Sequence, residues 1–182
     1  MGSELVTGRV WSRLSGTRRK SRQRAWVAVA YFGKGAAKLL PLPRGSRLVV
    51  DASDNAVKAG QTHPADLLAL QAKGVRVFSY PYLHGKIYVF GNVAAIGSAN
   101  ASYNSAQTLL EAMVMTTERR IVEGAKRFVE RIAKNELGPD QLSRLQKNAK
   151  RSPSGVESTE VRGRRMIFGG RAGTPSAAAT RS

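Results

Sequence analysis

The chain has 182 residues, and 30 lysine and arginine residues against 12 aspartate and glutamate residues give it a formal net charge of +18. This length suffices to bury the core of one domain, and the charge favours a polyanionic partner such as nucleic acid. Cysteine is absent and only two histidines occur, which excludes disulfides and thiol nucleophiles and argues against a zinc site built from His and Cys.

The N-terminal residues 1–24 contain seven basic residues and one acidic residue, without a lasting hydrophobic period. They are predicted to form a mobile basic arm. They also lack the sustained apolar core of a secretory signal. The longest apolar run, residues 25–32, is too short to span a bilayer. A soluble, cytoplasmic protein without stable membrane insertion is therefore expected.

The part of the chain that follows this arm alternates strand and helix signals. Residues 25–32, 47–51 and 75–78 are short apolar runs rich in β-branched residues, as in buried strands. Between them, residues 36–40 and 65–73 have the length and the flanking prolines or glycines of helices. This order predicts an α/β fold.

The second half of the chain predicts a hairpin, a further strand and a long helix. Residues 86–90 and 93–96 flank a Gly-Asn turn, which is typical of a β-hairpin. Residues 109–115 are predicted to form a further apolar strand. Residues 117–134 carry apolar side chains at helical spacing, with Thr117 as a candidate cap. The expected architecture is a mixed β-sheet flanked by helices.

The C-terminal residues 139–182 contain nine basic and three acidic residues. A short polar helix over 140–150 is compatible with the sequence, but the composition beyond Arg151 cannot bury enough apolar surface to fold. We therefore expect a folded domain over residues 25–138 between the N-terminal arm and a basic, largely disordered C-terminal tail. Such basic ends suit a polyanion, although a solubilising or merely disordered tail explains a charge run at least as well.

Two short motifs place four polar side chains on the predicted hairpin. His84 and Lys86 stand at the start of one strand, and Ser98 and Asn100 stand just beyond the other. Side chains two residues apart in an extended strand face the same way, so these groups are expected to meet at one end of the sheet. An imidazole, an ammonium, a hydroxyl and a carboxamide suit the binding of a phosphate and attack on its phosphorus.

Glu111 lies within the apolar run of residues 109–115, where a carboxylate is costly to bury without a partner. One natural partner is an imidazole, because a carboxylate fixes its tautomer and supports its cationic form. The alternatives are an exposed position on an edge strand and a structural salt bridge with an arginine. Taken alone, Glu111 fits these alternatives better.

Together these residues resemble the phospholipase D superfamily, whose signature is H-x-K-x4-D followed by G-S-x-N. The matching positions are His84, Lys86, Gly97, Ser98 and Asn100, and Glu111 matches a glutamate of the superfamily's small bacterial nucleases. The resemblance covers about residues 25–135. It departs from the signature at Gly91, where the motif has a supporting aspartate, which leaves open a weakened or altered site.

The resemblance implies a phosphodiesterase that needs neither a metal nor another cofactor. His84 would attack phosphorus and form a covalent phosphohistidine, which water then hydrolyses. Lys86, Ser98 and Asn100 would stabilise the charge on the phosphoryl oxygens. Glu111 would orient His84.

The mechanism implied by the resemblance needs a second histidine as general acid for the leaving oxygen. The chain holds a single copy of the motif, and its other histidine, His63, precedes Pro64 at a helix start and is a poor substitute. The resemblance therefore implies a homodimer, in which a twofold axis brings two copies of His84 together.

The first interpretation is a nuclease acting on DNA or RNA, because the motif indicates the reaction and the charge favours nucleic acid over lipid. A nucleic-acid-binding protein with a degenerate site is an alternative, for which Gly91 is the reason. A phospholipid phosphodiesterase is another. Tyr80 and Tyr82 come just before His84, and the sequence leaves open whether they stack on a base or pack within their loop.

Overall fold

The centre of the structure is the first apolar run of the chain. In the computed structural model, which describes residues 2–151, this run forms strand β2 (Ala25–Val29), and all five of its residues are buried. It pairs with β3 (Arg47–Val50) in parallel and with β5 (Lys86–Phe90) in antiparallel orientation. A strand buried on both faces explains why its sequence is a continuous apolar run and not an alternating one.

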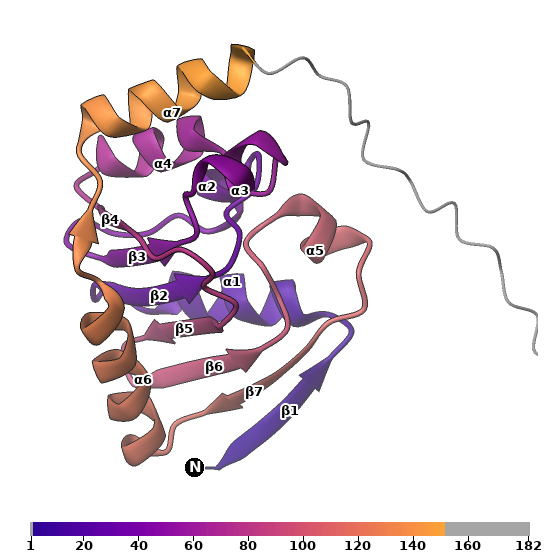
Figure 1. Cartoon of the computed structure of the whole chain (residues 1–182). Coiled ribbons are helices and arrows are strands. Elements are labelled where there is room, and N and C mark those ends of the chain that lie inside the picture. The colour runs from indigo at the N-terminus through magenta and orange to yellow at the C-terminus, as the bar shows by residue number, and fades with distance from the viewer. Residues whose placement is uncertain (1, 152–182) are drawn as a thin grey trace, which may run out of the picture.

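The sheet has eight strands in the order β1-β7-β6-β5-β2-β3-β4-β8 (Figure 1). The remaining strands are β1 (Ser3–Thr7), β4 (Arg76–Ser79), β6 (Val93–Gly97), β7 (Ala112–Thr116) and β8 (Asn135–Glu136). Only the pairs within β2-β3-β4 are parallel, and all other pairs are antiparallel. The predicted α/β fold with a mixed sheet is therefore confirmed.

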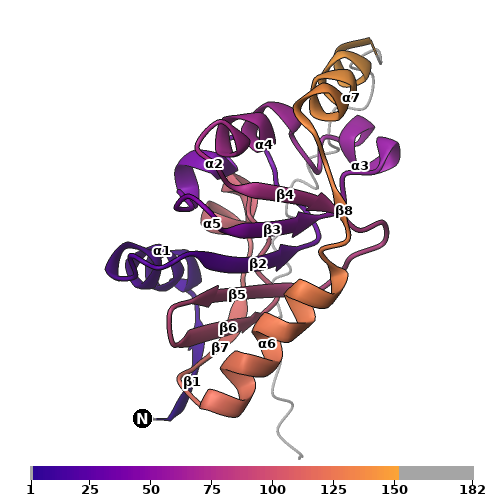
Figure 2. The same cartoon turned by 90° about the vertical axis from the view of Figure 1, so that its left-hand side faces the viewer.

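Helices cover both faces of this sheet (Figures 1 and 2). Helix α6 (Arg119–Ile132) covers one face, where its buried residues join Trp26, Ala28 and Val89 in one apolar cluster. The other face is covered by α1 (Val10–Lys20), α2 (Ala36–Leu39), α4 (Pro64–Gln71) and α7 (Pro139–Arg151). Two short helices, α3 (Asp54–Lys58) and α5 (Tyr103–Gln107), lie in connections between strands. Within residues 2–151, no helix is long and apolar enough to span a membrane.

The predicted hairpin and the long helix are present. Strands β5 and β6 pair from Ile87 with Ile96 to Phe90 with Val93, and the turn between them uses Gly91 at a φ of +61°. Helix α6 begins after Glu118, which is its N-cap residue and makes no side-chain capping bond. The expectation that Thr117 caps this helix is therefore wrong.

The expectation of a mobile arm over residues 1–24 is also wrong. Strand β1 pairs with β7, and α1 buries Val10, Trp11 and Leu14 against the sheet. Arginine and lysine occupy the exposed positions of this helix, and they obscure its narrow apolar stripe in the sequence. The folded domain consequently begins near residue 3.

The C-terminal boundary also lies further along the chain than residue 138. Helix α7 packs against α4 through Leu142, which is fully buried, and Gln71 donates a hydrogen bond of 2.7 Å to the carbonyl of Leu137. The segment expected to begin the disordered tail is thus part of the fold as far as residue 151. The rest of the predicted tail, residues 152–182, lies outside the described residues.

Candidate active site

His84 and Lys86 lie together at the start of β5. The Nζ atom of Lys86 is 3.2 Å from Nε2 of His84 and donates a hydrogen bond of 2.9 Å to the carbonyl of His84. A protonated ammonium can only donate, so Nε2 is the acceptor in this contact and the neutral imidazole carries its proton on Nδ1. The histidine is exposed, whereas Lys86 is 8% exposed. The expected pairing of these two side chains is present.

Two effects of its surroundings change the pKa of Lys86 in opposite directions. Burial lowers the pKa of Lys86, and the negative charge of Glu111 partly offsets this effect by raising it. Lys86 lies on the same face of the sheet as Val29, its register partner in β2. This is the face covered by α1, α2, α4 and α7. A lysine in this position is readily stabilised by a further anion, because little water reaches its ammonium group.

Ser98 lies where β6 ends, directly beside the start of β7. Its hydroxyl donates to Oε2 of Glu111, and the backbone N–H of Ala112 donates to Ser98 Oγ over 3.0 Å. The two strands approach closely here, since a Cβ atom on Gly97 would lie 2.7 Å from the Cα atom of Met113. Glycine at this position of the motif therefore lets the serine reach the glutamate.

Glu111 is buried, with an exposed fraction of 5%, and both of its carboxylate oxygens are engaged by serines. Ser98 donates to Oε2, and Ser105 donates to Oε1 over 2.6 Å. The expected contact between Glu111 and His84 is not formed among the described residues. The carboxylate instead holds Ser98 and acts on Lys86 through its charge.

Two buried aromatic residues support this arrangement, and the sequence alone did not identify them. Trp11 of α1 donates from Nε1 to the hydroxyl of Ser105 over 3.2 Å, which extends the chain of contacts from Glu111 to the N-terminal helix. Tyr88 donates to the carbonyl of Ala99 over 2.8 Å, and the pKa of Tyr88 is raised by its burial and by the charge of Glu111. Tyr88 thus holds the residue next to Ser98, and Trp11 holds Ser105, the second partner of Glu111. The only sequence signal for Trp11 was its place in the weak apolar stripe of α1.

Asn100 lies on the far side of Ser98 and is tied to the end of β2. Its Oδ1 atom accepts a hydrogen bond of 3.2 Å from the backbone N–H of Tyr31, and the next residue, Ala101, forms a parallel bridge with Phe32. The side chain is half-buried. This contact uses the oxygen of the carboxamide, so its donor group is not consumed by Tyr31.

Aromatic side chains surround His84 on its exposed side. A cavity of about 470 Å³ is lined by His84 together with Tyr80, Tyr82, Phe128 and Arg131, among others. Tyr82 is 95% exposed and has a φ of +63°, and its backbone N–H donates to Asp51 Oδ2 over 3.1 Å. Its ring therefore does not pack within the loop. A tyrosine held in the left-handed region is strained, and such strain is concentrated at functional sites.

Large apolar side chains are also exposed near the motif. Leu109 and Leu110, which directly precede Glu111, are 51% and 90% exposed. On the open part of the sheet, Val114 is paired with Leu5 on one side and with Ile96 on the other, and all three are exposed. Leu5, Val114 and Ile96 thus form an exposed apolar row across β1, β7 and β6. Surfaces of this kind mark interaction sites.

The second histidine of the chain is engaged elsewhere. His63 Nδ1 lies 2.7 Å from Asp66 Oδ2, at the start of α4. Asp66 also accepts hydrogen bonds from the backbone N–H groups of Gly35 and Ala37. This cluster ties α4 to α2.

Gly91, the position at which the signature has an aspartate, lies at the opposite end of β5 from His84. It is the fifth residue after Lys86, which in an extended strand corresponds to roughly 16 Å. A Cβ atom on Gly91 would lie 3.3 Å from Ser21 Oγ. The departure from the signature therefore removes no group from the immediate surroundings of His84.

Comparisons with known proteins agree with this fold. A family model described as the PLD-like domain of cardiolipin synthase matches residues 19–133. NucT from Helicobacter pylori and the phospholipase D family member Nuc from Salmonella typhimurium each superpose with a TM-score of 0.55 at 14% identity. NucT covers 75% of this chain and 98% of its own, and Nuc covers 74% and 97%. A phosphatidylserine synthase from Haemophilus influenzae gives a TM-score of 0.50 at 11% identity, over 81% of this chain and 42% of its own. No curated protein sequence matches the chain.

Proposed function

Because the chain belongs to the phospholipase D superfamily, which supports an enzyme of phosphodiesterase type, we propose that it is a nuclease hydrolysing DNA or RNA without a metal ion. The contact between His84 and Lys86 beside the Ser98–Glu111 pair carries this proposal. It joins a nucleophile, a cation and a hydroxyl donor at one end of the sheet, which phosphoryl transfer needs.

In the proposed reaction, Nε2 of His84 attacks phosphorus and forms a P–N bond while the P–O bond to the leaving nucleoside oxygen breaks. A second histidine gives its proton to that oxygen. Water then attacks phosphorus, the P–N bond breaks, and the second histidine takes a proton from the water. Lys86 and Asn100 donate hydrogen bonds to the non-bridging oxygens, and Ser98 does so once its single hydroxyl proton turns from Glu111 to the phosphate. Nζ of Lys86 lies 3.2 Å from Nε2 of His84, and an incoming phosphate would take over this ammonium.

The second histidine is proposed to be His84 of a second copy of the chain. Two observations support a homodimer. The imidazole of His63 is already paired with Asp66, and the exposed apolar residues Leu109, Leu110 and Ile96 lie next to the motif. A twofold interface on this surface would bury them and bring the two motifs together.

Nucleic acid is the proposed substrate because of the net charge of +18, which favours a polymer of phosphates. The exposed Tyr82 beside His84 also supports it, since an exposed aromatic ring can stack on a base. A phospholipid is the second candidate, favoured by the description of the matching family. A binding protein with a degenerate site is less well supported, because Gly91 lies far from His84 along β5.

The experiment that tests the proposal compares wild type with His84→Ala in EDTA. Its substrates are plasmid DNA, a single-stranded oligonucleotide, RNA and vesicles of phosphatidylglycerol. We expect nucleic acid to be cut by the wild type alone. Equal cleavage by both proteins would refute the role of His84, and hydrolysis of the lipid alone would establish the second candidate. Sedimentation of the wild type tests the homodimer, and a monomer at the concentrations of the assay would contradict it.

A further inference from the structure

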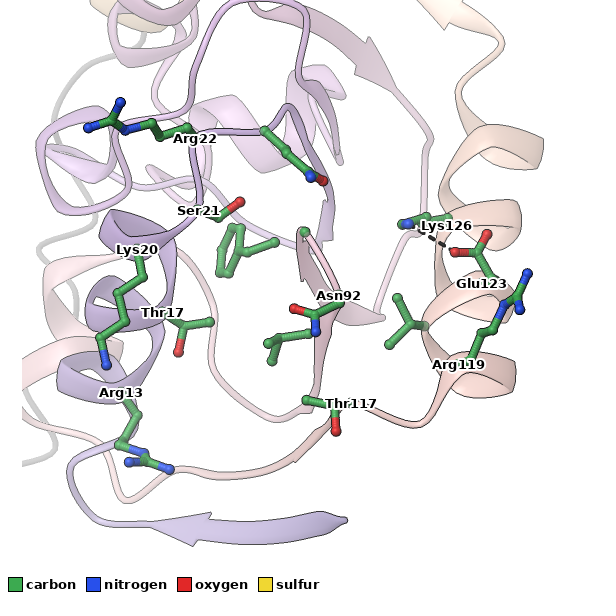
Figure 3. Close-up of a pocket in the computed structure, with 15 residues that line it drawn as sticks. Arg13, Thr17, Lys20, Ser21, Arg22, Asn92, Thr117, Arg119, Glu123 and Lys126 are labelled. Carbon is green, nitrogen blue, oxygen red and sulfur yellow. Dashed lines mark hydrogen bonds and ion pairs between the residues drawn. The ribbon is translucent and has the colours of Figure 1, made fainter. Parts of the chain in front are cut away.

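A large hollow lies away from the motif, at the other end of β5. It has a volume of about 980 Å³ and is floored by the β5–β6 turn, including Gly91 and Asn92. Helix α1 and the residues after it form one wall, and the start of α6 forms the other (Figure 3). We call this hollow the basic groove.

The two walls of the basic groove carry rows of polar side chains at helical spacing. Arg13, Thr17 and Lys20 follow one another along α1, and Arg119, Glu123 and Lys126 follow one another along α6 (Figure 3). Residues at positions i, i+4 and i+7 share one face of a helix, so each row is directed to the same side. The two rows lie on opposite sides of the β5–β6 turn (Figure 3).

The charge of the basic groove is strongly positive. Its lining has five basic residues, Arg13, Lys20, Arg22, Arg119 and Lys126, against a single acidic residue, Glu123. Arg13 pairs with Glu4, and Lys126 pairs with Glu123 over 2.9 Å. Within residues 2–151, Lys20, Arg22 and Arg119 have no acidic partner. The hydrogen bond from Lys126, followed by the charges of Lys126, Arg119 and Arg127, lowers the pKa of Glu123.

Hydroxyl groups in the same walls also lack partners. The Oγ atom of Ser21 and the Oγ1 atom of Thr117 are buried, and neither has a hydrogen bond among the described residues. Both residues line the basic groove. Because these two oxygens are enclosed, they do not present donors to the groove surface. The cations without an ion pair are therefore the groups that an anion would meet.

We infer that the basic groove is a second binding site for the phosphate backbone of nucleic acid, separate from the catalytic centre. The inference rests on the proposed function for the identity of the polymer. A concave, charged site suits a strand of phosphates better than a membrane surface, which is bound by exposed apolar faces. Of the three apolar residues that line this groove, Phe90 and Val122 are 2% and 3% exposed and Val93 is half-buried, so the groove has no exposed apolar face that could enter a bilayer.

The location of the groove sets a length requirement on the substrate. Gly91 and Lys86 are about 16 Å apart along β5, and phosphates of one duplex strand are about 3.4 Å apart along the axis. A duplex that reaches both sites therefore has at least about five base pairs. Shorter substrates occupy only the catalytic centre, so the groove should strengthen the binding of long substrates alone.

The test removes charge from the groove and compares the variant with one that loses the same charge elsewhere. The groove variant is Lys20→Gln with Arg119→Gln, and the control is Lys58→Gln with Lys73→Gln, which are exposed and outside the groove. Binding of a 30-nucleotide single strand is measured by fluorescence anisotropy at several salt concentrations, with His84→Ala present to prevent cleavage. Loss of two phosphate contacts reduces the steepness of the plot of log K against log salt concentration by about 1.4. It also lowers the affinity at 0.1 M salt by roughly tenfold or more.

A second pair of variants tests the groove without removing a side chain. Gly91→Asp adds a carboxylate to the floor, and Gly91→Asn adds a neutral group of the same shape. Asp and Asn both tolerate a positive φ. We expect Gly91→Asp to weaken binding of the 30-mer and Gly91→Asn to retain it. Equal binding by these two variants would overturn the inference, even if the double variant were unstable.

Hydrolysis of bis(p-nitrophenyl) phosphate, measured with His84 intact, separates the groove from the catalytic centre. This diester is too small to reach the groove, so its hydrolysis should be unchanged in all groove variants. If the wild type does not hydrolyse any diester but the groove variants still lose the 30-mer, the proposed reaction fails while the groove stands. An equal loss in the control variant, or loss of binding only to phosphatidylglycerol vesicles, would overturn the groove as a nucleic-acid site.

Discussion

Replacement of Glu111 by glutamine tests the electrostatic arrangement of the proposed site. The glutamine has nearly the same shape, and the hydroxyls of Ser98 and Ser105 can still bond to it, but the negative charge is lost. Hydrogen bonds to a charged group contribute about 1.5–3 kcal/mol, and those between neutral groups contribute about 0.5–1.5 kcal/mol. The two bonds from Ser98 and Ser105 together therefore lose about 2–3 kcal/mol.

If this loss falls on the transition state, kcat/KM decreases about 30- to 150-fold. The variant should also change the pH dependence. Burial lowers the pKa of Lys86, and the charge of Glu111 raises it. Without that charge the pKa of Lys86 falls further, so the ammonium loses its proton at a lower pH. The alkaline limb of the activity profile therefore moves to lower pH in Glu111→Gln.

The assay is hydrolysis of a small phosphodiester by the full chain across pH 5 to 11, with kcat and KM measured at each pH. Glu136→Gln is the control, because Glu136 is exposed and paired with Arg76. It should retain both the rate and the profile. An alkaline limb that stays in place or moves to higher pH in Glu111→Gln would refute the coupling between Glu111 and Lys86, whatever happens to the rate.

The remaining predictions concern the two ends of the fold and the mouth of the site. Trp11→Ala should lower the free energy of unfolding by about 3–5 kcal/mol in urea, whereas a residue in a mobile arm would have no effect. Leu142→Ala should cost about 2–5 kcal/mol in the same measurement, and a value near zero would show that α7 does not pack on α4. Tyr82→Ala should weaken binding of a single-stranded oligonucleotide by about 1–3 kcal/mol while Tyr82→Phe retains it, as measured by anisotropy; equal binding by both variants would refute stacking.

The elements that were predicted correctly are those with strong local signals. Strand β2 is a continuous apolar run, the β5–β6 hairpin has a Gly-Asn turn, and α6 has a wide apolar stripe. Strand β1 and helix α1 lack such signals. They are stabilised mainly by tertiary contacts, through pairing of β1 with β7 and burial of Trp11, and tertiary contacts override a weak local pattern.

In the candidate site, too, some contacts could be predicted from the sequence and others could not. Side-chain alternation along β5 correctly predicted that His84 and Lys86 would meet. The partners of Glu111 could not be predicted, because Ser98 and Ser105 reach it only through the close approach of β6 and β7 and the position of α5. No spacing in the sequence encodes that approach, although Gly97 marks where it occurs.

Gly91 shows how position in space changes the meaning of a departure from a motif. In the sequence, the missing aspartate suggests a weakened site. In the structure, a carboxylate at this position would be about 16 Å along β5 from Lys86, which exceeds the Debye length of about 8 Å at physiological ionic strength. It would instead stand on the floor of the basic groove, beside Ser21 and Gln23. Its absence leaves that floor without a negative charge, and binding of a phosphate backbone requires a floor of this kind.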